Sequence, residues 1–280
     1  MLNRFLIAVF IAFFLFSCSG NKDPDLASIP PTKKEIKEEM AEAYKEAIDA
    51  LKKGDSLYAS KKFSEAESLF PQSVWAPKSS LMSSYALYSI NFYSEAIFNL
   101  ERYIQIYPND TNISYAHYLI AICYFEQMLD EKKDTRPMIM AKEKFQFILN
   151  NFPNTDYAID GKYKLDLIID QLAAKEMYIG RYYMKVEKWI AAINRFKTVV
   201  REYSQTIYIE EALHRLVEIY YTIGLIEEAK KNAILLGYNY QSSKWYENTY
   251  KVFNKSYKPK RVKKVKEDGL IKRKIKSLFE

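Results

Sequence analysis

Apolar and small residues recur along the chain in a fixed order. An aromatic or apolar residue is followed three positions later by Ala, four positions after that by a large or apolar residue, and twelve positions after the Ala by a helix stop. Four blocks follow this order: Tyr93, Ala96, Leu100 and Pro108; Met138, Ala141, Phe145 and Pro153; Trp189, Ala192, Phe196 and Ser204; and Ile226, Ala229, Ala233 and Gln241. Spacings of three, four and seven place residues on one helical face, and a small Ala lets a second helix approach closely. The pattern therefore predicts a helical repeat.

A second set of positions predicts the partner helix of each pair. Counting back twelve from the Ala finds small residues, and counting back nine finds large ones: Gly54, Ser84 and Gly180, then Leu57, Leu87, Tyr183 and Tyr220. The order resembles tetratricopeptide (TPR) units, which stack because one helix pair alone cannot bury its apolar face. We predict an all-α fold, a right-handed α-solenoid of about five irregular TPR helix pairs. Insertions interrupt it as a loop over Asp130 to Arg136 and a lengthened helix near Lys164 to Tyr178.

The first repeat differs from the others. Thr32 and Glu35 have capping-box spacing, so a helix should begin there. Phe63, Ala66 and Phe70 fit the repeat order, but Pro71 follows Ala66 by only five positions. We therefore expect the second helix of this repeat to be clipped by about two turns.

The N-terminus predicts export and lipidation. Residues 1–17 contain Arg4 and an apolar stretch of twelve residues, Phe5 to Phe16, too short to span a bilayer, which needs about 20. The end of this stretch resembles a bacterial lipobox, with Cys18 as the lipidated residue. A residue other than Asp after that Cys, here Ser19, implies the outer membrane in such lipoproteins. The alternative is an ordinary secretory peptide with an incidental Cys.

Charge is concentrated at the C-terminal end. Residues 255–280 contain eleven Lys or Arg and three acidic residues, a net +8, whereas the whole chain carries +7. The domain prediction is thus a signal peptide at 1–17, a lipid-anchored flexible tether at 18–31, a TPR solenoid at 32–254 closed by Trp245 to Phe253, and a basic disordered tail at 255–280. The tail could be a solvated end, a contact to anionic lipid or an acidic partner, or a nucleic-acid arm, and export argues against the last.

The sequence offers little chemistry for an enzyme. His117 and His214 are far apart and lack metal-ligand spacing, and Cys123 is most simply a core residue once Cys18 is lipidated. Pairs of carboxylates fall on predicted polar helix faces, where we expect solvation: Glu38 and Glu39, Glu210 and Glu211, and Glu227 and Glu228. Only 7 of 280 residues are Gly, and no phosphate-binding loop or nucleophile motif is present. We predict a non-enzymatic protein with no cofactor, no catalytic residue and no metal site.

Longer motifs resemble one family. They are Pro71-Gln72-Ser73-Val74-Trp75-Ala76, Pro153-Asn154-Thr155-Asp156-Tyr157-Ala158, and the run from Leu172 to Tyr203, which includes Gly180-Arg181-Tyr182-Tyr183 and Trp189-Ile190-Ala191-Ala192-Ile193-Asn194-Arg195-Phe196. Over about residues 18–253 the chain resembles the BamD family, lipoproteins of the outer-membrane β-barrel assembly (BAM) machine. Generic TPR proteins share the Ala and Pro positions but not this last run.

The resemblance implies an adaptor on the periplasmic side of the outer membrane. Its C-terminal repeats would dock on a POTRA domain of the barrel-forming subunit BamA, with Arg195 as a partner-binding residue, alongside other BAM lipoproteins. The alternative for Arg195 is a surface residue paired within its own repeat. The N-terminal repeats would receive unfolded β-barrel substrates, and the aromatic candidates there are Tyr58, Tyr85, Tyr88 and Tyr115, none of them assigned. Rival hypotheses are another periplasmic TPR lipoprotein in cell division or peptidoglycan coordination, and an envelope hydrolase with converging carboxylates.

Overall fold

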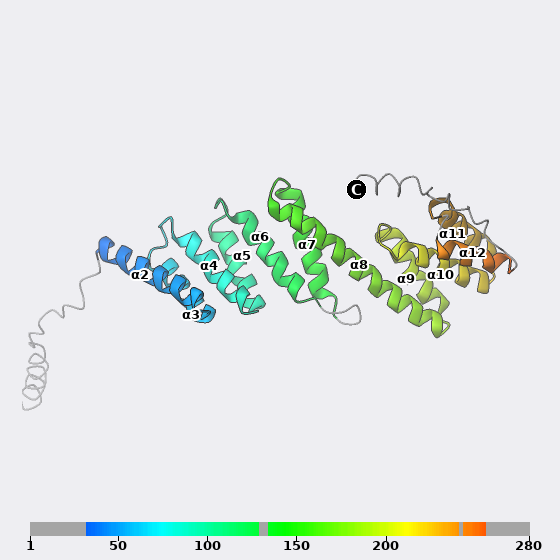
Figure 1. The fold of residues 1–280 in the computed structure, drawn as a ribbon, viewed down its shortest axis with the longest axis horizontal. Coiled ribbons are helices and arrows are strands. Elements are labelled where there is room, and N and C mark those ends of the chain that lie inside the picture. The colour runs from blue at the N-terminus through cyan, green and yellow to red at the C-terminus, as the bar shows by residue number, and fades with distance from the viewer. Residues whose placement is uncertain (1–31, 129–133, 241–242, 256–280) are drawn as a thin grey trace, which may run out of the picture. The chain divides into compact units, whose positions relative to one another are not determined.

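The computed structural model describes residues 32–128, 134–240 and 243–255. Every regular element within these ranges is an α-helix (Figure 1). In chain order the helices are α2 (Lys33–Lys52), α3 (Ser56–Leu69), α4 (Ala76–Ser89), α5 (Tyr93–Ile106), α6 (Ile113–Glu126), α7 (Arg136–Asn151), α8 (Asp156–Lys185), α9 (Trp189–Glu202), α10 (Ile209–Thr222), α11 (Ile226–Asn239) and α12 (Lys244–Phe253). The predicted all-α class is confirmed. The predicted signal segment, Cys18, the tether and the tail beyond residue 255 lie outside the described residues.

The chain divides into two compact units, the first ending at Ser83 and the second beginning at Ser84, inside α4. In the first unit α2 packs on α3 around Met40, Ala43 and Ala66. In the second unit each helix from α5 to α11 packs on the next one, and α12 packs on both α10 and α11. Stacking in chain order is the arrangement expected of a helical solenoid.

The repeat residues form the core. Ala96, Ala141, Ala192 and Ala229 are all fully buried. The aromatic residue before each helix stop is the C-cap, and its backbone N–H donates to the carbonyl four residues earlier: Tyr107 to Tyr103, Phe152 to Ile148, Tyr203 to Val199, and Tyr240 to Leu236. The spacing rule therefore predicts these helices and their ends correctly.

The prediction of a clipped second helix in repeat one is wrong. Helix α3 has 14 residues, as many as α5, α9 and α11. Its repeat Ala is Ala59, not Ala66, because Ala59 is the fourth residue of α3, is fully buried, and precedes Pro71 by twelve positions. Gly54 consequently lies in the turn between α2 and α3 with φ +84°, rather than within a helix. Leu57, expected to press on the partner helix, is exposed.

Other local predictions hold. The Thr32 capping box is present: the Thr32 N–H donates to Glu35 Oε2 at 2.7 Å, and the Glu35 N–H donates to Thr32 Oγ1 at 3.3 Å. The lengthened helix is α8, with 30 residues. The loop prediction is one residue too long, since Arg136 already begins α7, and residues 129–133 lie outside the described ranges. The closing segment forms α12 and covers α10 and α11.

Cys123 is a core residue of α6, as predicted. Its side chain is fully buried, and burial raises the pKa of the thiol to about 12. None of the described helices combines the length and apolarity needed to cross a membrane.

Candidate functional site

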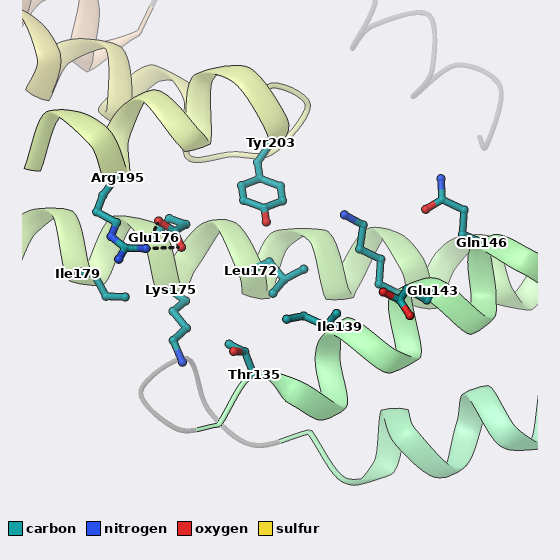
Figure 2. Close-up of a pocket in the computed structure, with 11 residues that line it drawn as sticks. Thr135, Ile139, Glu143, Gln146, Leu172, Lys175, Glu176, Ile179, Arg195 and Tyr203 are labelled. Carbon is teal, nitrogen blue, oxygen red and sulfur yellow. Dashed lines mark hydrogen bonds and ion pairs between the residues drawn. The ribbon is translucent and has the colours of Figure 1, made fainter. Parts of the chain in front are cut away.

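Arg195 projects from α9 between two anchoring residues. Its neighbours Ala192 and Phe196 are fully buried, whereas the Arg195 side chain is 42% exposed. Figure 2 shows the guanidinium reaching from α9 toward α8. A core-anchored helix thus carries a partly exposed cation, so the backbone beneath that cation is held in place.

The partner of Arg195 is Glu176 on α8. Arg195 Nη1 lies 3.2 Å from both carboxylate oxygens of Glu176, whose side chain is 18% exposed (Figure 2). Since α8 and α9 are the two helices of one repeat, this matches the alternative in which Arg195 pairs within its own repeat. Arg195 can pair with Glu176 and also bind a partner only if its guanidinium has N–H donors that Glu176 does not use.

Close packing of α8 on α9 makes this ion pair possible. A Cβ at Gly180 would lie 2.7 Å from Phe196 Cε1, so the absence of a side chain lets the Phe196 ring rest against the α8 backbone. Glu176 stands one helical turn before Gly180, and Arg195 immediately precedes Phe196. The glycine therefore sets the helix separation that Glu176 spans to reach Arg195.

The ion pair lies at one end of a groove between α7, α8 and α9 (Figure 2). The groove has a volume of about 540 Å³. Its apolar wall consists of Ile139 from α7 and Leu172 and Ile179 from α8. Ile139 is exposed, so the wall offers apolar surface to a partner.

Charged residues complete the groove. Lys142, Lys175 and Arg195 supply three positive charges, and Glu143 and Glu176 supply two negative ones. The lining is therefore net positive by one charge, although the chain outside the tail is nearly neutral. Such a surface favours an acidic partner.

Tyr203 also lines the groove, beside the Lys142 ammonium, which stands 6.0 Å from the centre of its ring. Burial raises the pKa of Tyr203, and the charges of Glu202 and Glu176 raise it further. The phenol is therefore neutral at physiological pH and serves as a hydrogen-bonding group.

A second charge cluster joins α8 to α10. Arg181 Nε donates to Glu211 Oε1 at 2.9 Å, and Arg215 Nε donates to the same oxygen at 3.3 Å. The prediction that Glu211 is solvated is wrong, because the residue is buried. Burial alone would raise the pKa of Glu211, but the two arginines outweigh it and lower the pKa below its ordinary value.

His214 belongs to the same face of α10 and is structural. It is buried, its Nδ1 lies 2.9 Å from Thr249 Oγ1, and its Nε2 lies 3.3 Å from Glu218 Oε1. Its ring lies against Trp245, so it helps to attach α12. The described residues hold no group of three or more His, Cys, Asp or Glu arranged to bind a metal ion.

The first unit has its own apolar hollow, of about 490 Å³, on α2. Its floor is Met40 and Tyr44, and Trp75 meets the Tyr44 ring edge-on at 5.2 Å. Lys34, Lys37 and Glu38 line it as well, and Lys34 Nζ lies 3.9 Å from Glu38 Oε1. Nothing in the sequence distinguished Tyr44 from the many other tyrosines, although Trp75 lies in one of the family-like motifs.

The suggested tyrosines do not line this hollow. The Tyr58 hydroxyl donates to Glu46 at 3.4 Å, on the surface of the first unit. In the second unit Tyr85 contacts Tyr88, and Tyr115 contacts Tyr157. None of the four therefore contributes to this apolar hollow.

Stacked helix pairs of this kind define a helical-repeat protein of the TPR type. Comparison with known proteins identifies the family. The family model described as YfiO, an outer membrane lipoprotein, matches residues 36–235. The chain is also similar to proteins named outer membrane protein assembly factor BamD, and it belongs to the BamD family.

Three relatives illustrate the similarity. The BamD of Caulobacter vibrioides is 41% identical over 251 residues, covering 89% of this chain and 80% of that protein. The BamD of Rickettsia prowazekii is 38% identical over 242 residues, covering 86% of this chain and 93% of that protein. The BamD of Neisseria meningitidis serogroup A is 31% identical over 210 residues, covering 71% and 79%. These names favour an assembly factor over the division or peptidoglycan hypothesis.

Proposed function

We propose that the protein is a non-enzymatic lipoprotein component of the outer-membrane β-barrel assembly machine. Its role is to hold the barrel-forming subunit and to receive unfolded barrel substrates. The observation that carries the proposal is the family match across both units, residues 36–235, among relatives named assembly factors. The groove beside Arg195 supplies a docking surface within that matched region.

Docking on a POTRA domain of BamA is assigned to the α7–α8–α9 groove. Arg195 is partly exposed and stands on a helix fixed by buried Ala192 and Phe196. A guanidinium presents five donors in a planar fork that suits a carboxylate. Because the core already fixes the helix backbone, a partner that binds Arg195 has to order only its side chain.

Substrate reception is assigned to the hollow of the first unit. Tyr44 and Trp75 provide aromatic surface for an apolar side chain of an extended peptide, and the charged lining, Lys34 and Lys37 with Glu38, is net positive by one. Replacing Trp75 by Ala should weaken crosslinking of an unfolded barrel substrate to the protein. Undiminished crosslinking would exclude the hollow.

Membrane attachment is assigned to Cys18. Each acyl methylene that enters the bilayer contributes about 0.8 kcal/mol, so a multiply acylated Cys anchors stably. The Cys18→Ser variant should leave the outer-membrane fraction. Retention there would contradict lipid anchoring.

A pull-down with the lipidated full-length chain tests the docking proposal. Wild type should recover a large β-barrel subunit, and Arg195→Glu should not. Arg201→Glu is the matched control, because Arg201 also stands on α9 but is 76% exposed and pairs with the adjacent Glu202. Failure of wild type to recover the subunit would reject the adaptor function, whereas equal recovery by all three forms would reject the Arg195 assignment.

A further inference from the structure

The Arg195 guanidinium is only partly used. Both of its hydrogen bonds to Glu176 come from Nη1, and no described residue accepts a hydrogen bond from Nε or Nη2. A guanidinium has five N–H donors, so most of the fork stays available. The Glu176 carboxylate occupies the position beside Arg195 that a partner's carboxylate would need in order to pair with the same guanidinium.

We propose that Glu176 is an internal stand-in for a partner carboxylate. In the free protein it occupies Arg195 and keeps the guanidinium over the groove, and an incoming carboxylate from the partner replaces it. Glu176 is thus a positioning and specificity-determining residue that acts through Arg195. The inference rests on the proposed docking function.

The groove also defines the chemistry of the segment that displaces Glu176. Leu172 and Ile179 lie on α8 on either side of Glu176, and Ile139 faces them from α7. A segment that fits both features presents a carboxylate beside an apolar side chain. A purely acidic segment would leave the apolar wall exposed to water. A purely apolar segment would bury the charged side chains of the groove without giving them groups of opposite charge.

Displacement is feasible because the internal pair is weak. Its arginine side chain is 42% exposed, and solvent screens such pairs strongly. Glu176→Gln keeps the side-chain shape but replaces the charged competitor for Arg195 with a neutral one. It should therefore tighten binding by about two- to fivefold, the range expected for one half-exposed ion pair.

A mutant cycle with detergent-solubilised BamA as the probe tests the inference. Dissociation constants are measured for the lipidated full-length chain as wild type, Glu176→Gln, Arg195→Met and the double variant. Glu176→Gln should tighten binding in the wild-type background and have no effect in the Arg195→Met background.

Glu143→Gln is the matched control, because Glu143 lines the same groove and forms no ion pair with a described residue. If Glu143→Gln tightens binding as much as Glu176→Gln, the tighter binding comes from the overall charge of the groove, and the stand-in role is overturned. Unchanged or weaker binding by Glu176→Gln, or an equal effect without Arg195, overturns it too. Binding unaffected by Arg195→Met would instead reject the docking assignment, and with it this inference.

Discussion

Gly180 is the residue whose substitution tests the packing beneath the site most directly. A Cβ there would stand 2.7, 2.9 and 3.0 Å from Cε1, Cζ and Cδ1 of Phe196. Phe196 is fully buried, so its ring has little room to retreat. We predict that Gly180→Ala forces α9 away from α8 and destabilises the protein.

Two opposing effects set the change in the free energy of unfolding. Ala is favoured over Gly within a helix by about 0.5–1 kcal/mol. Overpacking a filled core costs about 1–3 kcal/mol. Gly161→Ala is the control, because Gly161 is also buried in α8 but its Cβ would meet Phe145 Cδ1 at 3.1 Å and Leu149 Cδ1 at 3.4 Å, a milder contact. The helix preference is the same in both variants and cancels, so Gly180→Ala should be the less stable of the two, by at most the overpacking cost of about 1–3 kcal/mol.

Urea unfolding of the full chain, followed by helical circular dichroism, measures this difference, with equal m-values required for the comparison. Phe196→Leu removes part of the obstructing ring, so it should reduce the cost of Gly180→Ala in a double-mutant cycle. A Gly180→Ala protein as stable as Gly161→Ala would refute the close-packing argument. Because Arg195 adjoins Phe196, the proposed docking function predicts that the same variant also weakens binding to BamA.

Two further predictions follow from groups with altered pKa values. Arg181 and Arg215 hold the pKa of Glu211 below its ordinary 4.5, so Glu211 stabilises the fold above that pH and loses its contribution as the pH falls through the lower folded value. Glu211→Gln should therefore flatten the acid limb of stability against pH in urea titrations, and parallel limbs would contradict the ion-pair cluster. Burial raises the pKa of Cys123 to about 12, so the folded Cys18→Ser variant, whose remaining thiol is Cys123, should react with Ellman's reagent at about pH 8 only after denaturant is added. Rapid reaction without denaturant would show that α6 is not packed as described.

Local spacing predicted the helices well but failed to set the register of the first repeat. Ala59 and Ala66 are seven residues apart, about two helical turns, so both lie on the buried face and both are fully buried. Apolar periodicity cannot separate two such residues. The distance to the following proline does separate them. Ala59 lies twelve positions before Pro71, just as Ala96 lies twelve positions before Pro108.

The site was less accessible to sequence reasoning because it depends on contacts between helices. Periodicity places Glu211 and Glu176 on helices but does not say which residue faces them. Their arginine partners, Arg181 and Arg195, are 30 and 19 residues away in the sequence. The resemblance to the BamD family singled out Arg195, but only the packing of α8 on α9 identifies Glu176 as its partner.

The packing of α8 on α9 and the ion pair between these helices depend on the same four residues: Gly180, Phe196, Glu176 and Arg195. Gly180 brings the helices together, Phe196 fills the space that its missing side chain leaves, and the resulting separation lets Glu176 reach Arg195. A change to either packing residue must alter the position of the charge pair, because Phe196 and Arg195 are adjacent on a rigid helix. The proposed docking in this groove would therefore be coupled to the stability of one helix pair, and it predicts that packing variants impair docking even where they touch no partner.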